Sequence, residues 1–343
     1  MSNNNTVKIT IDGNDAGFES DKQDTLLRAA LRSGVNVPYE CNSGGCGSCK
    51  FELIDGEVED IWQDAPGLSP RDRRKGRRLS CQCKPKTDCT IKMQTGTETL
   101  SGPKPERFSV TYVGRRDLTD DMAEFHFQSQ TPAHFRSGQF ALFDLPGIEG
   151  DRAYSMSNVA NENGDWTFII KQMPDGQGTH YLFHTLQDGD TLNIDGPYGH
   201  AFFREDVERD IVLIGGGSGL SPVMSIARTV VGLPQFSDRT VHLFYGGRGP
   251  QDICTPDLIQ EIDPVGAKLI CHNAVSDVEL AQQHGWDGPC GFVHEVVEEK
   301  LNGTMPQFEY YFCGPPPMTQ AVQRLTMIEN QVPFDQIHFD RFF

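Results

Sequence analysis

Apolar and polar residues alternate at a period of two in several short stretches, and each predicts a half-buried β-strand. The first is residues 6–12 (TVKITID), which end at Gly13, and Phe18 lies where the return strand of a hairpin would follow. Two more are residues 108–113 and 123–127. Turn residues recur between such stretches, as is typical of a small antiparallel barrel.

Other stretches predict helices and fully buried strands. Residues 25–31 (TLLRAAL) follow Asp24, a plausible helix cap, and stop at Gly34. Residues 210–215 (DIVLIG) are an apolar run that leads into a glycine turn, with a helix expected from about Val223. A buried strand, a glycine turn and a helix start together predict a parallel α/β unit.

Length and composition indicate several domains. The chain has 343 residues, with 35 glycines and 21 prolines, which favours two or three turn-rich domains. Residues 102–105 (GPKP) read as a linker. We therefore expect a multi-domain α+β and α/β protein, divided into residues 1–100, 104–204 and 205–343.

Charge and cysteine content narrow the classes of function. The net charge of -18 argues against nucleic acid or an anionic membrane as a partner. Residues 1–100 hold 14 Lys/Arg against 15 Asp/Glu, so almost all of the excess negative charge lies beyond them. No apolar run approaches about 18 residues, and the N-terminus lacks the features of a signal peptide. These observations predict a soluble, cytoplasmic protein.

The cysteines favour metal. Six of the ten fall between Cys41 and Cys89, and residues 41–49 (CNSGGCGSC) have the Cys-x4-Cys-x2-Cys spacing of a plant-type [2Fe–2S] site. The glycines suit a loop whose backbone N–H groups must approach the sulfurs. The fourth ligand is expected later, at Cys81 or Cys83. A zinc site that uses this second pair, or free thiols, are the alternatives.

Residues 152–158 (RAYSMSN) combine a cation, an aromatic ring and a hydroxyl on one strand. Those groups suit a ligand with a pyrophosphate and a flat heterocycle, as in a flavin. The same residues are also compatible with an ordinary half-buried strand that binds no ligand. Gly178 and Thr179 open an expected helix over residues 180–186, where a pyrophosphate would be favoured.

Residues 215–222 (GGGSGLSP) form a glycine turn between a strand and a helix, which predicts a nucleotide site. The turn departs from the Gly-x-Gly-x-x-Gly fingerprint, because Leu220 takes the place of the last glycine. Residues 71–78 (RDRRKGRR) are the one dense basic run. It reads either as a solvated face or as a docking patch for an acidic partner or for the acidic remainder of this chain.

Residues 1–95 resemble a plant-type ferredoxin, a β-grasp domain whose last ligand sits in a Leu-Ser/Thr-Cys stretch followed four residues later by proline. Cys81 fits that register before Pro85, whereas Cys83 falls where ferredoxins carry a small apolar residue. The resemblance implies that Cys41, Cys46, Cys49 and Cys81 hold the cluster, and that Cys83 and Cys89 are packing residues.

The whole chain resembles ferredoxin–NAD(P)+ reductase-like flavoproteins fused behind a ferredoxin, in particular the reductase components of bacterial di-iron monooxygenases. The resemblance implies an antiparallel FAD-binding β-barrel and a doubly wound, parallel-sheet NAD-binding domain after the ferredoxin. For FAD it implies Arg152, Ala153, Tyr154, Ser155, Asn158, Ile170, Lys171, Gly178 and Thr179. For the nicotinamide nucleotide it implies Gly216, Gly217, Ser218, Gly219, Arg248, Gly314 and Pro315. It also implies Cys313 beside the flavin, with Phe343 or Phe342 over its ring.

The activity implied is an NADH-dependent reductase with FAD and a [2Fe–2S] cluster, since a flavin accepts a hydride and releases electrons one at a time. NADH is favoured over NADPH because Asp252 follows Arg248 closely, and an acid near the ribose disfavours the extra phosphate. The expected acceptor is a hydrocarbon monooxygenase hydroxylase, directly or through a small Rieske ferredoxin. The alternatives are the reductase of an aromatic ring-hydroxylating dioxygenase and a redox sensor without turnover. A monomer is expected.

Overall fold

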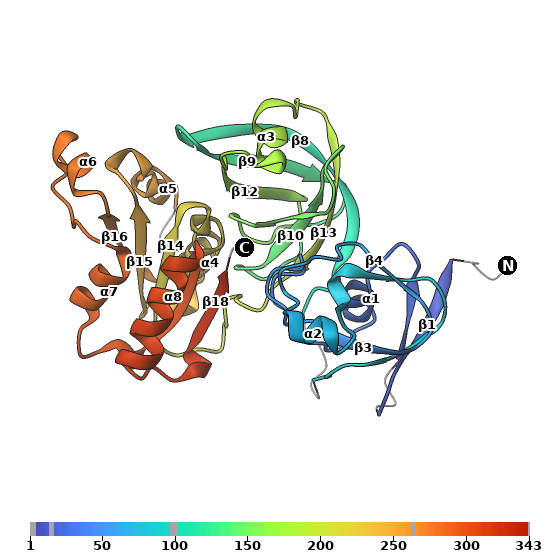
Figure 1. Cartoon of the computed structure of the whole chain (residues 1–343). Helices are drawn as coiled ribbons and strands as arrows, with labels where there is room; N and C mark the ends of the chain where they lie inside the picture. Colours follow the sequence, from blue (N-terminus) through green and yellow to red (C-terminus); the bar gives the residue numbers. More distant parts are fainter. Residues whose placement is uncertain (1–4, 14–16, 97–101, 263–264, 342–343) are drawn as a thin grey trace.

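The computed structural model describes residues 5–13, 17–96, 102–262 and 265–341. Figure 1 shows three bodies in chain order: an N-terminal part in blue, a barrel in green and a C-terminal part in orange and red. None of the helices in these ranges combines the length and the apolar character needed to cross a membrane.

The N-terminal part is a small mixed sheet that packs on one helix. Its five-stranded sheet has the order β2-β1-β7-β3-β5, with β1 and β7 parallel, and β4 pairs with β6 beside it. Its elements are β1 (Thr6–Ile11), β2 (Gly17–Asp21), α1 (Leu26–Arg32), β3 (Lys50–Asp55), β4 (Val58–Asp60), α2 (Pro70–Arg74), β5 (Arg77–Leu79), β6 (Cys83–Pro85) and β7 (Cys89–Lys92).

Helix α1 begins one residue later than the sequence suggests. Its cap is Thr25, whose hydroxyl accepts a hydrogen bond from the N–H of Arg28, and Asp24 instead accepts from the N–H of Thr25. The apolar face of the helix, with Leu27 and Ala30 fully buried, lies against Ile9 and Ile91 of the sheet in one core. Because both capping groups are short polar side chains, the sequence alone does not separate them.

The middle part is an antiparallel six-stranded sheet of order β11-β10-β13-β8-β9-β12. A hydrogen bond from the N–H of Ser157 to the carbonyl of Thr167 joins the chain after β11 to β12, so the two ends of the sheet meet in a barrel. Its elements are β8 (Glu106–Thr119), β9 (Met122–Ser129), β10 (Phe140–Asp144), β11 (Arg152–Ser155), β12 (Asp165–Lys171), α3 (Gln177–His184) and β13 (Thr191–Tyr198).

The C-terminal part is a parallel five-stranded sheet of order β16-β15-β14-β17-β18, with helices on both faces. Its strand order reverses at β14, the arrangement of a doubly wound sheet. Its strands are β14 (Asp210–Gly216), β15 (Thr240–Gly247), β16 (Lys268–Val275), β17 (Phe308–Gly314) and β18 (Ile337–Arg341). Its helices are α4 (Leu220–Gly232), α5 (Thr255–Gln260), α6 (Val278–Gln283), α7 (Val293–Leu301) and α8 (Pro316–Gln323).

The predicted fold class is thereby confirmed for all three parts. The sheets end and begin within the predicted domain ranges: β7 stops at Lys92, β8 starts at Glu106 and β14 starts at Asp210. Two helix starts were placed late, because α3 begins at Gln177 and α4 at Leu220.

The N-terminal part packs directly on the barrel. Phe140, Leu142 and Tyr198 of the barrel belong to the same buried cluster as α1 and the N-terminal sheet. Arg28 of α1, only 6% exposed, forms an ion pair of 2.6 Å with Asp151 of the barrel. A buried pair of this kind fixes the relative orientation of two surfaces, because separation would leave the charges without their partners.

Candidate functional site

The four predicted cluster ligands lie as two pairs of thiols. The sulfurs of Cys41 and Cys46 are 3.3 Å apart, and those of Cys49 and Cys81 are 3.2 Å apart. Among the described residues, no group of three or more His, Cys, Asp or Glu side chains could hold a single metal ion. Two pairs of thiols match a cluster with two irons, each bound by two cysteines, better than one tetrahedral zinc.

The loop that carries these cysteines directs backbone N–H groups at the sulfurs. The N–H groups of Ser43 and Cys46 lie 3.5 and 3.4 Å from the sulfur of Cys41, and that of Ser48 lies 3.5 Å from the sulfur of Cys46. Gly47 has a φ of +78°, and a Cβ there would lie 2.3 Å from the carbonyl of Gly67. Donors around the sulfurs are what stabilise thiolates bound to iron.

Cys83 and Cys89 take part in other contacts. The thiol of Cys83 lies 3.0 Å from a carboxylate oxygen of Asp60, and that of Cys89 lies 3.2 Å from the carbonyl of Thr87. Burial, and after it Asp60, raises the pKa of the Cys83 thiol, so it stays protonated. Cys81 lies within a 3-10 turn over Ser80–Gln82, so the segment from Cys81 to Cys83 is not fully extended, which is the condition for both sulfurs to share one face. The assignment of Cys81 remains a prediction that mutation can test.

The predicted flavin residues meet at the start of α3. Arg152 and Tyr154 alternate on β11, which pairs with β10. A Cβ on Gly178 would lie 3.1 Å from Cγ of Arg152 and 3.4 Å from Oη of Tyr154. Arg152 and Tyr154 therefore form one surface with the first turn of α3, which lies far from them in sequence, and Gly178 keeps that surface open. This cradle fits the anion and the flat ring of FAD.

The first turn of α3 borders an open cavity of about 900 Å³, of a size that suits a cofactor. Lys171, another predicted residue, lines it and forms an ion pair of 2.8 Å with Asp121. Thr179 accepts a hydrogen bond from the N–H of Met173 and so shapes the turn before the helix. Ile170 is buried, whereas Ala153 is exposed.

The side chain of Asn158 takes part in hydrogen bonds within the barrel, and its role at the cofactor stays a prediction. Its amide donates to the carbonyl of Asp165 and accepts from the N–H of Thr167, which ties the end of β11 to β12. Its carbonyl accepts from Ser225 of α4. The side chain thus joins two parts of the barrel, and the backbone carbonyl joins the barrel to α4.

The glycine turn after β14 interlocks with the turn after β17. A Cβ on Gly219 would lie 2.0 Å from the carbonyl of Cys313, and one on Gly216 would lie 2.5 Å from the sulfur of Met318. Gly217 has a φ of +55° and Gly314 one of +156°. Gly216, Gly217, Ser218, Gly219, Gly314 and Pro315 therefore gather at the carboxyl ends of β14 and β17, where an open parallel sheet binds nucleotides.

Cys313 is 3% exposed and lies opposite Asp340 on the neighbouring strand β18. Burial, followed by the charge of Asp340, raises the pKa of the Cys313 thiol, so it is a neutral group that can position a ring but is a poor nucleophile. Burial, followed by the charges of Glu40 and Cys41, raises the pKa of Asp340 to about 7. The sequence analysis missed Asp340, although an acid in an aromatic tail was a visible signal. Phe342 and Phe343 lie outside the described residues.

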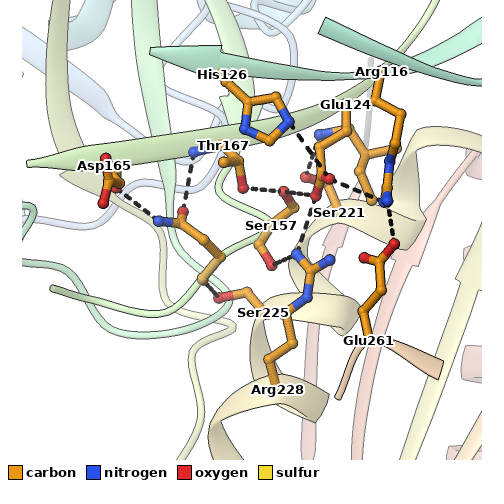
Figure 2. Close-up of polar contacts among 12 residues, drawn as sticks. Arg116, Glu124, His126, Ser157, Asp165, Thr167, Ser221, Ser225, Arg228 and Glu261 are labelled. Atoms are coloured by element: carbon orange, nitrogen blue, oxygen red, sulfur yellow. Dashed lines mark hydrogen bonds and ion pairs between the residues drawn. The ribbon is translucent and has the colours of Figure 1, made fainter. Parts of the chain in front are cut away.

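A second missed group is the polar network between the barrel and α4 (Figure 2). Glu124, 4% exposed, pairs with Arg228 at 3.1 Å and with Arg116 at 3.3 Å, and accepts from Ser157 at 3.0 Å. Ser221, in the glycine turn, donates to the carbonyl of Ser155. These residues are dispersed in sequence, so no local pattern marks them.

The predicted ribose residues lie after β15. Arg248 is highly exposed, with its guanidinium 4.0 Å from the carboxylate of Asp277. Asp252 accepts hydrogen bonds from the N–H groups of both Arg248 and Gly249, so it shapes this turn. Two carboxylates beside Arg248 make the end of β15 unfavourable for a phosphate.

Comparison with known families agrees with this division. Residues 9–86 match the 2Fe-2S iron-sulfur cluster binding domain, residues 109–203 the oxidoreductase FAD-binding domain and residues 213–324 the oxidoreductase NAD-binding domain. The three matches cover most of the chain, and each falls on one of the three bodies described above.

Similar proteins span the same three domains. The ferredoxin–NAD(P)+ reductase CarAd of Metapseudomonas resinovorans is 42% identical over 93% of this chain and 94% of its own length. The ferredoxin–NAD+ reductase component of the alkene monooxygenase system of Xanthobacter autotrophicus is 37% identical over 96% and 98%. A solved ferredoxin reductase in carbazole 1,9a-dioxygenase superposes with a TM-score of 0.89 at 40% identity, and the match covers 98% of both chains.

Proposed function

This chain belongs to the family of ferredoxin–NAD(P)+ reductases that serve oxygenases, and we propose that its acceptor is the hydroxylase of a hydrocarbon monooxygenase, reached directly or through a small Rieske ferredoxin. The chain is an oxidoreductase with a [2Fe–2S] domain, a FAD-binding domain and an NAD-binding domain. When bound, NADH would supply a hydride to FAD, and FAD would release the two electrons of the hydride one at a time to the cluster, with the proton lost to solvent.

One observation carries the electron path proposed within this chain: the three candidate sites are linked by direct contacts. The N–H of Gly199 in the barrel donates to the hydroxyl of Tyr39, two residues before the first cluster cysteine. Ser221 of the glycine turn donates to Ser155 of the flavin strand. Electron transfer requires the nicotinamide, the flavin and the cluster to lie at fixed, short distances from one another. The two hydrogen bonds hold the segments expected to bind these three groups in fixed relative positions.

The residues of the chain have mainly positioning roles in this proposal. Arg152 holds the pyrophosphate and Tyr154 the flat ring, while the glycine turn admits the nucleotide backbone. Cys313, neutral and buried, sets the face of the nicotinamide against the flavin. A hydride step needs no acid–base catalyst, so neither Cys313 nor Asp340 has to move a proton in it.

NADH is the proposed donor. Asp277 lies beside Arg248, and Asp252 holds the turn that carries it. The 2′-phosphate of NADPH would bring about two negative charges next to these carboxylates. We also propose a monomer in the cytoplasm, where the ten cysteines, all free, stay reduced.

A second acceptor is favoured by a specific observation. The carbazole 1,9a-dioxygenase reductase shares its overall structure with this chain at a TM-score of 0.89. A ring-hydroxylating dioxygenase is therefore the alternative partner. With either partner, electrons would follow the same path from NADH to the cluster within this chain. The test below therefore addresses that path first.

The test is an anaerobic titration with NADH, followed by visible absorption. Bleaching of the flavin bands and then of the cluster bands, with about three electrons taken up per chain, would support the proposal. Bleaching of the flavin alone would mean that the cluster is not in electronic contact. If neither NADH nor NADPH bleached the flavin, the reductase function would be excluded and a redox sensor without turnover would replace it.

A further inference from the structure

We propose that the outer face of helix α2, together with Trp62, is the docking surface for a separate electron acceptor with an acidic face. This basic face comprises Arg71, Arg74 and Lys75. The proposal rests on the reductase function above, because it names the surface by which electrons leave the cluster. Docking itself can be measured without electron transfer.

Among the residues that the structure describes, the basic face is not neutralised by acidic side chains. The other charged residues of this run pair inside the N-terminal part: Arg77 pairs with Asp72 and Glu52, and Arg78 with Asp60. Asp72 is the buried residue of α2 itself, and it also pairs with Lys50. Within the described ranges, no ion pair or hydrogen bond is recorded for the exposed side chains of the basic face. The reading in which this run binds the acidic remainder of the chain is therefore not supported.

The basic face is rigidly connected to the cluster loop. Arg73 of α2 donates to the backbone carbonyls of Gln63 and Ala65. The same loop donates from the N–H of Gly67 to the carbonyl of Gly44, between the first two cluster cysteines, at 2.9 Å. One short loop thus separates the basic side chains from the residues that hold the cluster.

Trp62 gives this surface an apolar centre. Its ring is 46% exposed, and a Cβ on Gly44 would lie 3.2 Å from it. Trp62 is next in sequence to Gln63, whose carbonyl accepts a hydrogen bond from Arg73 of α2. An exposed tryptophan joined in this way to a basic helix matches the composition of an interface hot spot with a charged rim. The flavin side of the cluster loop lies elsewhere: the hydroxyl of Tyr39, two residues before Cys41, accepts a hydrogen bond from the N–H of Gly199 in the barrel. Electrons can therefore enter at one end of the loop and leave at the other.

Charge complementarity identifies the partner. The chain as a whole carries a net charge of -18, so an acidic protein is repelled by most of its surface and attracted to the basic face. Such focusing both speeds association and orients the partner toward the cluster.

The test uses an acidic haem protein, the soluble domain of cytochrome b5, as the probe. The triple variant R71E/R74E/K75E is compared with the control K8E/K22E/K92E, which makes the same change of charge in the same domain. Figure 1 places α2 and β1, which carries Lys8, at opposite ends of that domain. Equilibrium binding is measured by surface plasmon resonance at low salt, with both proteins oxidised.

We expect the α2 triple to weaken binding by about tenfold or more and the control triple by much less. W62A should also weaken binding while it leaves the cluster absorption intact. An equal loss in both triples would mean that only net charge matters and would overturn the proposal. The same holds if the wild type fails to bind the probe. The binding measurement does not depend on electron transfer. Its result therefore tests the docking surface even if the NADH titration fails.

Discussion

The hydroxyl of Ser221 donates a 2.6 Å hydrogen bond to the backbone carbonyl of Ser155, and it accepts one of 3.0 Å from the N–H of Ile169. Ser221 lies in the first turn of α4, directly after the glycine turn proposed to admit the nicotinamide nucleotide, whereas Ser155 and Ile169 belong to two strands of the barrel. One buried hydroxyl therefore joins the segment expected to bind NADH to the strands expected to bind the flavin.

We expect Ser221→Ala to slow hydride transfer several-fold, because the turn can then shift relative to the flavin strand, and small misplacements are costly for near-attack geometry. The measurement is stopped-flow flavin reduction by NADH. FAD content should stay normal, and Ser237→Ala, on an exposed loop, serves as the control. An unchanged reduction rate would show that the hydrogen bond has no part in alignment.

The variants Cys81→Ser and Cys83→Ser should show which of these two cysteines is the fourth ligand of the cluster. The first should lose the [2Fe–2S] absorption while NADH still reduces the flavin, because only Cys81 pairs with Cys49. The second should keep the cluster, since its thiol faces Asp60. Iron content and visible spectra are the readouts, and the opposite outcome would transfer the fourth ligand to Cys83.

Arg152→Ala should release FAD. Hydrogen bonds to a charged group contribute about 1.5–3 kcal/mol, so affinity should fall by about 10- to 100-fold. Gel filtration followed by the ratio of flavin to protein absorbance measures the loss. Arg107→Ala, an exposed arginine in the same barrel, is the matched control. Stoichiometric FAD after gel filtration of the Arg152 variant would remove that residue from the site.

Glu124→Gln should lower the stability of the barrel–α4 junction by about 3 kcal/mol, because it leaves the partly buried Arg228 without its ionic partner. Burial alone would raise the pKa of Glu124, but Arg228 outweighs it and the pKa lies below its usual 4.5. The ionised carboxylate therefore adds stability above about pH 4.5, and this contribution is lost as the pH falls through the folded-state pKa.

The check is the melting temperature of the wild type and of Glu124→Gln across pH 3.5 to 7. The gap between them should be widest near neutral pH and should narrow below about pH 4.5. A gap that did not change with pH would mean that the loss comes from packing rather than from charge.

Much of the fold followed from local patterns. The alternation in residues 6–12 predicted a strand, and the apolar run before Gly215 predicted the central strand of the parallel sheet. The Cys-x4-Cys-x2-Cys spacing predicted the cluster loop, because a loop around two irons needs its ligands and glycines close in sequence. Local patterns were less exact at helix starts, where Thr25 rather than Asp24 is the cap.

The sequence by itself determined which cofactors this protein is built for, since each binding turn is a short segment whose glycines and polar side chains act through their own backbone geometry. Tertiary structure alone decided how the sites are joined. Ser221 meets Ser155, Glu124 meets Arg228 and Asp340 lies opposite Cys313, and each pair is separated by tens of residues. Such contacts depend on how whole sheets pack, and that packing leaves no periodic trace in the chain.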